Sequence, residues 1–256
     1  MKVLGINTAT IFGSIGLVST DRVLGEYSLN TPITHSERLM NCIDGLLADT
    51  RVHIEEVDGF SITLGPGSFT GLRIGVSTVK GLAFATGRPV TGVSTLEALA
   101  FNLFGSQDEI CPILDARKNE VYAALFKADG SHRLKRLTPD MVISPQDLVK
   151  QIHGKVAFLG DGVDVYGSFL RRKLGRRASL VAPELGYVHG AVVAHMGLRL
   201  MQRGKTLEIA SLVPHYVRRS EAEIKYDDMS KKETEEGVFA DGRKNRGSRK
   251  KTSRGK

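Results

Sequence analysis

Short apolar runs alternate with amphipathic stretches along the first hundred residues. The run Val3–Ile6 is continuously apolar, which predicts a buried strand. Thr34-His35-Ser36-Glu37 has the capping-box spacing, and the apolar positions that follow recur at helical intervals, which predicts a helix from there to about Asp49. The other elements predicted in this half are strands at Gly13–Ser19, Val23–Ser28, Phe60–Leu64 and Arg88–Val93, and helices at Gly71–Thr86 and from a Thr95 cap to about Phe104.

The second half has the same mixture of strand and helix patterns. Strands are predicted at Ile110–Leu114, Glu120–Phe126 and Val156–Leu159, helices after Ser144-Pro145, at Val163–Leu174 and at Tyr187–Arg203 with Gly204 as its stop, and a strand or extended stretch at Val213–Arg218. An antiparallel meander followed by parallel strands with helical crossovers is typical of half of an actin-like or ribonuclease-H-like α/β fold. We therefore predict mixed sheets in two lobes: residues 1–108, residues 109–224 with a C-terminal helix that returns toward the first lobe, and a charged tail at residues 225–256.

The stretch from Ser61 to Gly75, SITLGPGSFTGLRIG, organises the first lobe. A Gly-Pro-Gly turn joins the predicted strand to the next helix, which Ser68 or Thr70 can cap. Free N–H groups at such a helix start can face an anion, so the turn is a candidate phosphate loop. Its candidate residues are Gly65, Gly67, Ser68, Phe69 and Thr70. The spacing is GxGxxxG, with no Walker lysine and no dinucleotide fingerprint, so a tight strand-to-helix turn is the alternative interpretation.

The helix predicted at Gly71–Thr86 carries more apolar surface than its own sheet requires. Arg73, Ser77 and Lys80 are its clearly polar residues and fall on one narrow face at about 100° per residue. A helix that covers a single sheet needs an apolar stripe only slightly wider than about 100°. The helix is therefore either buried between two layers of one domain, or packed on its own sheet and also on a second protein.

Charge changes the picture only at the C-terminus. The chain of 256 residues has 36 Lys and Arg against 28 Asp and Glu, but Arg243–Lys256 alone holds eight Lys or Arg and no acid. The rest of the chain is therefore neutral, and the basic tail is either a solubilising end or a salt-sensitive contact with RNA phosphates. The two cysteines form no CxxC pair, and neither a signal peptide nor a membrane span is indicated, so a cytoplasmic protein without membrane contact is expected.

The residues for several kinds of catalysis are missing from the sequence. No two of the seven histidines have the HxxxH spacing, and there is no GxSxG elbow. Asp115 and Asp161, each at the end of a predicted strand, are the best carboxylates for a site, but the favoured interpretation is that they are ordinary turn formers. Asn7 stands at the end of the first strand, where an actin-like phosphotransferase needs a carboxylate for its metal. We therefore expect no catalytic residue and no metal site in this chain.

Six sequence blocks closely resemble the bacterial TsaB family, also called YeaZ. They are INTAT at Ile6–Thr10, HSERLM at His35–Met40, LGPGSFTGLRIG at Leu64–Gly75, GVSTLEALA at Gly92–Ala100, LDARKNEVY at Leu114–Tyr122 and PHYVRRSEAE at Pro214–Glu223. The resemblance implies an ASKHA fold and a non-catalytic subunit that dimerises through its first helices with TsaD. With the ATPase TsaE, that complex transfers the threonylcarbamoyl group of threonylcarbamoyl-AMP to the N6 of adenosine 37 in tRNAs that read ANN codons. Many family members have Asp where this chain has Asn7.

The resemblance also implies where the partner docks. The helices at Thr34–Asp49 and Gly71–Thr86 should form the docking face, with Leu39, Met40, Ile43, Gly71, Ile74, Gly75, Thr78, Val79 and Leu82 as its candidate residues. We expect Gly75→Arg to abolish TsaD binding while the monomer stays folded, and the same face to form homodimers when TsaD is absent. No cofactor is expected in this chain, since ATP, ADP and metal belong to the partner subunits, and tRNA would be met through the complex with help from Arg243–Lys256. The alternative functions are an ASKHA-type ATPase and a metalloprotease related to TsaD.

Overall fold

The computed structural model describes residues 1–30, 35–130 and 133–218, with the backbone alone at residues 35–37. Its first sheet has the strand order β3-β2-β1-β4-β5, in which β1, β2 and β3 are antiparallel and β1, β4 and β5 are parallel. The bounds of these strands are Lys2–Asn7 (β1), Phe12–Ser19 (β2), Val23–Asn30 (β3), Gly59–Gly65 (β4) and Val90–Ser94 (β5). All five strands predicted in this half of the chain are present.

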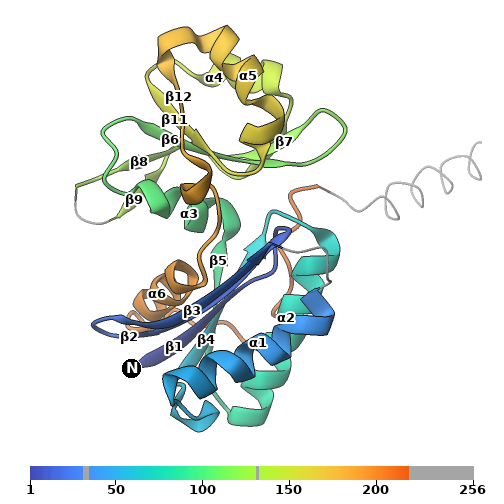
Figure 1. Ribbon diagram of the computed structural model, residues 1–256, viewed down its shortest axis with the longest axis vertical. Helices are drawn as coiled ribbons and strands as arrows, with labels where there is room; N and C mark the ends of the chain where they lie inside the picture. The colour runs from blue at the N-terminus through green and yellow to red at the C-terminus, as the bar shows by residue number, and fades with distance from the viewer. Residues whose placement is uncertain (31–34, 131–132, 219–256) are drawn as a thin grey trace, which may run out of the picture. The chain divides into compact units, whose positions relative to one another are not determined.

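Helices cover both faces of this sheet. Helices α1 (His35–Thr50) and α2 (Phe69–Thr86) lie on one face, and α6 (Gly190–Met201) lies on the other (Figure 1). Successive side chains of a strand point to opposite faces, so Leu4 packs into the core under α1 and α2 while Val3 packs against α6. Burial on both faces explains why β1 reads as a continuous apolar run.

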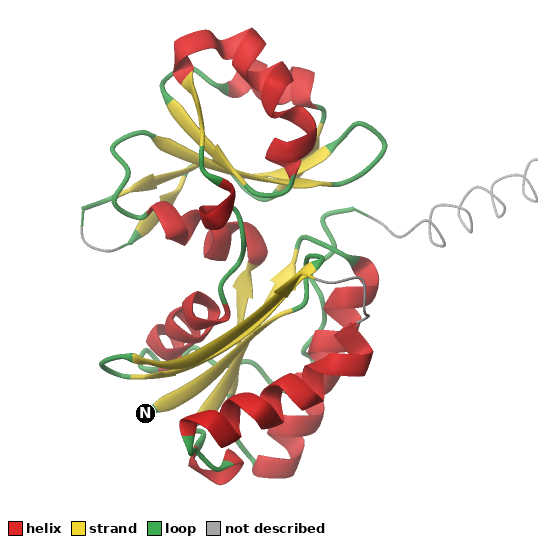
Figure 2. Ribbon diagram, in the orientation of Figure 1, coloured by secondary structure: helices red, strands yellow, loops and turns green. Residues whose placement is uncertain are grey.

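The second sheet follows α3 (Thr95–Ala100) and has the main strand order β10-β7-β6-β11-β12, with β8 paired to β6 and to β9. Its strands are β6 (Glu109–Asp115), β7 (Val121–Ala123), β8 (Phe126–Ala128), β9 (Leu134–Arg136), β10 (Met141–Ile143), β11 (Val156–Leu159) and β12 (Ala178–Leu180). Helices α4 (Pro145–Gln151) and α5 (Gly162–Leu174) pack against each other beside it (Figure 2). Short 3-10 turns occur at Ile54–Glu56, Phe101–Leu103, Gly175–Arg177 and Pro183–Leu185.

Some predicted elements differ from the observed ones. The strand predicted at Glu120–Phe126 is two strands, because the chain leaves the ladder at Leu125, whose N–H binds the Thr138 hydroxyl. The cap of α3 is Ser94, which accepts a hydrogen bond from Glu97 N–H at 3.3 Å, and Thr95 is buried inside the first turn.

Two further differences lie near the C-terminus. The helix predicted at Tyr187–Arg203 is shorter, because Tyr187 stacks on Phe12 outside it, and the helix ends at Met201. Of the two forms predicted for Val213–Arg218, a strand or an extended stretch, the strand is absent, and His215 N–H of this segment binds Leu64 O at 2.7 Å.

Helix α6 lies backbone against backbone on the first sheet. A Cβ added at Gly5 would lie 2.2 Å from Ala194 N, and one at Gly16 would lie 2.2 Å from Ala191 N. These two glycines let the helix approach β1 and β2 more closely than any other residue would. By its internal contacts the chain divides into Met1–Val217, which contains both sheets, and Arg218–Lys256. The predicted tail, with its basic end at Arg243–Lys256, lies outside the described residues.

The start of α6 is tied to β3 by a pair of titratable groups. His189 Nδ1 lies 2.8 Å from a Glu26 oxygen, and the other Glu26 oxygen accepts from Ala191 N–H at 3.0 Å. The hydrogen bond to Glu26 raises the pKa of His189 above its usual 6.5, against the effect of burial. Burial would raise the pKa of Glu26, but its hydrogen bonds with His189 and Ala191 outweigh it and lower that pKa below 4.5.

This pair predicts a defined pH dependence of stability. The His189 contribution is fully present below the unfolded pKa and is lost as pH rises through the higher folded pKa; the Glu26 contribution is lost as pH falls through its lowered folded pKa. We expect the urea midpoint of the wild type to be higher at pH 6 than at pH 9, and His189→Gln to lose most of that difference. An equal drop between the two pH values in both proteins would contradict the assignment.

Candidate functional site

Helices α1 and α2 pack side by side on the first sheet and present one outer surface to solvent (Figure 1). The inner side of α2 is held in the core by Val76, Val79 and Ala83. The helix begins where Ser68 Oγ accepts a hydrogen bond from Gly71 N–H at 3.2 Å, and it ends at Gly87 with a φ of 66°. Because both ends of α2 are capped and its inner side is buried, the helix holds its outer surface in a fixed position.

The structure divides the nine predicted docking residues into two groups. Five are buried in the chain's own fold: Leu39, Ile43, Gly71, Gly75 and Val79. Four are accessible: Met40, with 44% of its surface exposed, and the half-buried Ile74, Thr78 and Leu82. Cys42 and Gly45 of α1 face the β3 residue Tyr27, so the opposite side of the helix, which carries Met40, faces α2.

Gly75 is buried because it faces the chain's own sheet. A Cβ at this position would lie 2.2 Å from Thr8 Oγ1 and 2.9 Å from Ile62 Cδ1. The packing argues against the expectation that Gly75→Arg leaves the monomer folded, because the arginine would enter the interface between α2 and the sheet.

The docking residues predicted from the sequence do not include Phe84, an exposed apolar residue on α2. Phe84 has 85% of its surface exposed, the largest fraction among the exposed large apolar side chains of the described residues. It lies on the polar face of α2, four residues after Lys80 and seven after Ser77. A phenylalanine at the helical spacing of a polar stripe is the sequence signal that identifies it. We call the accessible residues Met40, Ile74, Thr78, Gly81, Leu82 and Phe84 the α1–α2 surface.

The Gly-Pro-Gly turn is filled by other parts of the chain. A Cβ at Gly65 would lie 2.4 Å from His215 O, and one at Gly67 would lie 2.2 Å from Ala9 O. Ser68 N–H already donates to Ala9 O at 2.6 Å. Carbonyl oxygens on both sides are unfavourable neighbours for an anion, so these contacts favour the tight-turn interpretation over the phosphate loop.

Phe69, the next residue of that predicted loop, serves another contact. Its ring stacks on Tyr216 at a centroid distance of 4.3 Å, and the Arg73 guanidinium lies 4.1 Å from the Phe69 centroid. Arg73 Nε also donates to the Tyr216 hydroxyl at 3.0 Å. This cluster fastens the segment around His215 to the start of α2, while Thr70 remains exposed beside it.

The Asn7 side chain is fully engaged by the β1–β2 turn and by Thr63 of β4. Its Oδ1 accepts from Thr63 Oγ1 at 3.0 Å and from Ala9 N–H at 3.2 Å, and its Nδ2 donates to Phe12 O at 3.0 Å. A neutral amide with these partners closes a turn and offers no charged oxygen to a cation.

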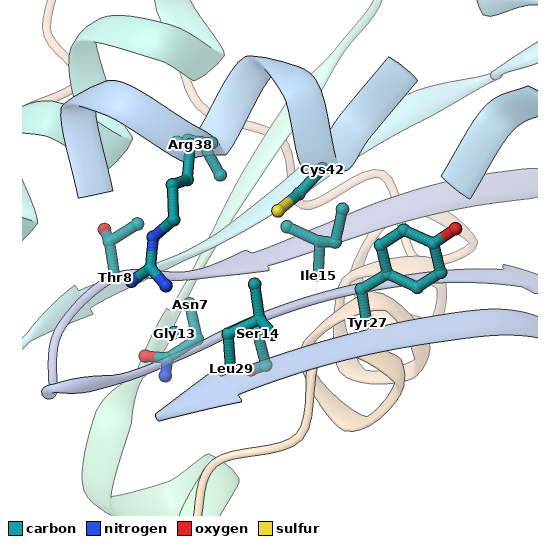
Figure 3. Close-up of a pocket in the computed structure, with 10 residues that line it drawn as sticks. Asn7, Thr8, Gly13, Ser14, Ile15, Tyr27, Leu29, Arg38 and Cys42 are labelled. Atoms are coloured by element: carbon teal, nitrogen blue, oxygen red, sulfur yellow. The ribbon is translucent and has the colours of Figure 1, made fainter. Parts of the chain in front are cut away.

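A small cavity of about 30 Å³ lies between this turn and α1. Figure 3 shows Arg38 reaching from α1 toward Thr8 and Asn7, and Cys42 of the same helix lying above Ile15. That volume has room for only about two water molecules, so the cavity is too small for a substrate. Thr8 Oγ1 is buried here and has no hydrogen-bond partner among the described residues.

Asp115 and Asp161 are brought together at the carboxyl ends of β6 and β11. Asp161 Oδ1 accepts from Asp115 N–H at 2.9 Å, and Asp115 pairs with Arg117 at 3.0 Å. Burial raises the pKa of Asp161. Both carboxylates are thus engaged with the hairpin after β6, as expected for turn formers.

Among the side chains that the structure describes, at residues 1–30, 38–130 and 133–218, no three His, Cys, Asp or Glu gather where they could hold a metal ion. Across the same ranges no helix is both long and apolar enough to cross a bilayer.

Comparisons with known proteins give a consistent result. Residues 30–226 match the family model of TsaD, tRNA N6-adenosine threonylcarbamoyltransferase. The TsaB protein of Bacillus subtilis (strain 168), a tRNA threonylcarbamoyladenosine biosynthesis protein, is 30% identical over 234 residues, which cover 90% of this chain and 100% of the relative. The TsaB protein of Escherichia coli (strain K12) is 26% identical over 229 residues, covering 87% of this chain and 96% of the relative.

A solved structure agrees with these relatives. YeaZ from Pseudomonas aeruginosa superposes with a TM-score of 0.72 at 27% identity, over 84% of this chain and 99% of that one. The predicted fold class, an actin-like ASKHA α/β fold with mixed sheets, is confirmed.

Proposed function

The chain belongs to the TsaB (YeaZ) family of tRNA threonylcarbamoyladenosine biosynthesis proteins, and from this premise we propose that it is a non-catalytic subunit that binds and activates a TsaD threonylcarbamoyltransferase. The observation that supports this most directly is the α1–α2 surface, which exposes Phe84 and Met40 beside the half-buried Ile74, Thr78 and Leu82. Large apolar side chains gathered on two rigid helices are typical of a protein-binding surface.

The surface suits a helical partner. Gly81 lies between Ile74 and Phe84 on the outer side of α2 and has no atom within 4 Å of its would-be Cβ, so a partner helix can come close there. A standard interface buries about 800 Å² on each partner, and a few central residues provide most of the binding energy. We assign that central role to Gly81, Leu82 and Phe84.

The absence of catalysis in this chain is part of the proposal. The Asn7 amide is engaged by its own turn, and the Gly-Pro-Gly turn is filled by the chain's own carbonyl oxygens. We propose that ATP, ADP and metal bind to the TsaD and TsaE subunits, that tRNA is met through the complex, and that the chain forms homodimers when TsaD is absent. A cytoplasmic location fits a tRNA-modifying role and the free thiols of Cys42 and Cys111.

The test is reconstitution of adenosine-37 modification with and without this chain, and with a surface variant. Met40→Glu/Leu82→Glu places two carboxylates on the α1–α2 surface, and we expect at least a tenfold loss of TsaD co-purification and of modification. Val165→Glu is the matched control, since Val165 on α5 is 58% exposed and lies on another surface. Full modification without the chain, or unchanged co-purification of the double variant, would refute the proposal. ATP hydrolysis or bound metal in the purified chain would instead favour an ATPase or a metalloprotease.

A further inference from the structure

The end of α5 carries a dense group of positive charges. Arg171, Arg172 and Lys173 form the last turn of the helix, and Arg176 and Arg177 follow in the 3-10 turn after Gly175. All five are exposed, whereas Leu174 between them is 4% exposed. We call these five residues the α5 basic patch. Residues 1–242 have equal numbers of basic and acidic residues, so their net charge gives no sign of this local group.

Carboxylates do not neutralise the patch. Within the described part of the chain, no salt bridge involves any of the five residues. Arg177 donates to Ile152 O at 2.9 Å, and the Arg172 guanidinium lies 5.9 Å from the centroid of the Phe169 ring on the same helix. The hydrogen bond of Arg177 brings the exposed His153 and Lys155 to the border of the patch. One or two cations satisfy a helix C-terminus, so five exceed what the helix dipole requires.

We propose that the α5 basic patch binds the phosphate backbone of RNA. Four of the five residues are arginines, whose planar guanidinium groups bind phosphate oxygens through two parallel hydrogen bonds. This rests on the proposed function, in which the complex acts on tRNA, and it assigns this subunit its own RNA contact on the second sheet's helices. Such a contact depends on the charge and spacing of the RNA phosphates and does not distinguish one base from another.

The apolar content of the patch favours RNA over a membrane. Basic segments that lie on anionic bilayers also insert apolar side chains at the interface. In Arg171–Arg177 the apolar residue is Leu174, which is buried and cannot insert. A ribose-phosphate backbone needs only the charges.

The experiment measures binding of a tRNA transcript that reads ANN codons to the full chain, alone and with TsaD, at several salt concentrations. The patch variant changes Arg171, Arg172, Lys173 and Arg176 to Gln and keeps Arg177, whose hydrogen bond holds the turn. The control changes four other exposed cations to Gln: Lys127, Lys135, Arg203 and Lys205. Circular dichroism checks that both variants are folded.

We expect the patch variant to bind RNA at least about tenfold more weakly near 100 mM salt, with a slope of log K against log salt shallower by up to about 3. The control should change the affinity by less than threefold. Equal losses of RNA affinity in both variants, or an unchanged salt slope in the patch variant, would overturn the proposal. A patch variant that still binds RNA but no longer binds phosphatidylglycerol vesicles would overturn it as well. The patch variant should still co-purify with TsaD. If the wild-type chain binds RNA through the patch but does not bind TsaD, only the proposed function is refuted.

Discussion

Gly75→Arg should yield a protein that does not fold, whereas Gly81→Arg on the same helix should yield a folded protein that no longer binds TsaD. The first arginine begins 2.2 Å from Thr8 Oγ1, inside the packed layer between α2 and the sheet. It must either bury an unpaired guanidinium or separate the helix from the sheet, and each costs several kcal/mol. That is a large part of the roughly 5–15 kcal/mol that stabilises a typical domain. Soluble yield and thermal melting by circular dichroism measure the outcome.

The second arginine makes the comparison decisive. Gly81 has open space around its would-be Cβ, and arginine is a better helix former than glycine by nearly 1 kcal/mol. Gly81→Arg should therefore melt at or above the wild-type temperature while TsaD co-purification falls at least tenfold. A folded, TsaD-binding Gly75→Arg protein would mean that α2 does not pack as described, and TsaD binding by Gly81→Arg would exclude the outer side of α2 from the interface.

Gly16→Leu is expected to have a comparably large effect on the opposite face of the sheet. The new side chain would begin 2.2 Å from the backbone nitrogen of Ala191, and a backbone atom cannot rotate away as a side chain does. The helix would have to lift off β2 and lose its contacts with Val3 and Val18. We expect a loss of more than about 4 kcal/mol, which lowers the melting temperature by roughly 10 °C or prevents folding.

Gly105→Leu is the matched control for that change. It is the same substitution in a turn where no atom lies within 4 Å of the new Cβ. It should melt within a few degrees of the wild type. If Gly16→Leu behaved in the same way, the close packing of α6 on the sheet would be wrong.

The sequence predicted the long elements well because their apolar spacing is set by local geometry. Strand β1 and helix α1 show this, since burial on two faces or on one stripe leaves a readable pattern. Strands β9, β10 and β12, which were not predicted, have three residues each, too few for a pattern. The break at Leu125 depends on Thr138, a partner 13 residues away that no local window includes.

The candidate site was predicted only in part for a related physical reason. Helical spacing identified α2 as too apolar for one sheet, but it could not say which apolar residues face inward. Val79 and Gly75 face the core, while Phe84 faces solvent. The glycines of the turn after β4 were interpreted as room for a ligand, yet the atoms next to them are His215 O and Ala9 O. Contacts between distant segments decide such cases.

The position of α6 has a consequence for how the protein is made. Its residues follow β5 by nearly a hundred positions, yet they cover the face of the first sheet that Val3 and Val18 occupy. At about 5–20 residues per second, the ribosome needs roughly 5–20 s to deliver this cover after the sheet's last strand has emerged. During that interval the nascent chain presents a bare apolar face, which a chaperone can hold. A premature stop codon before Gly190 would make that exposure permanent and leave an aggregating fragment.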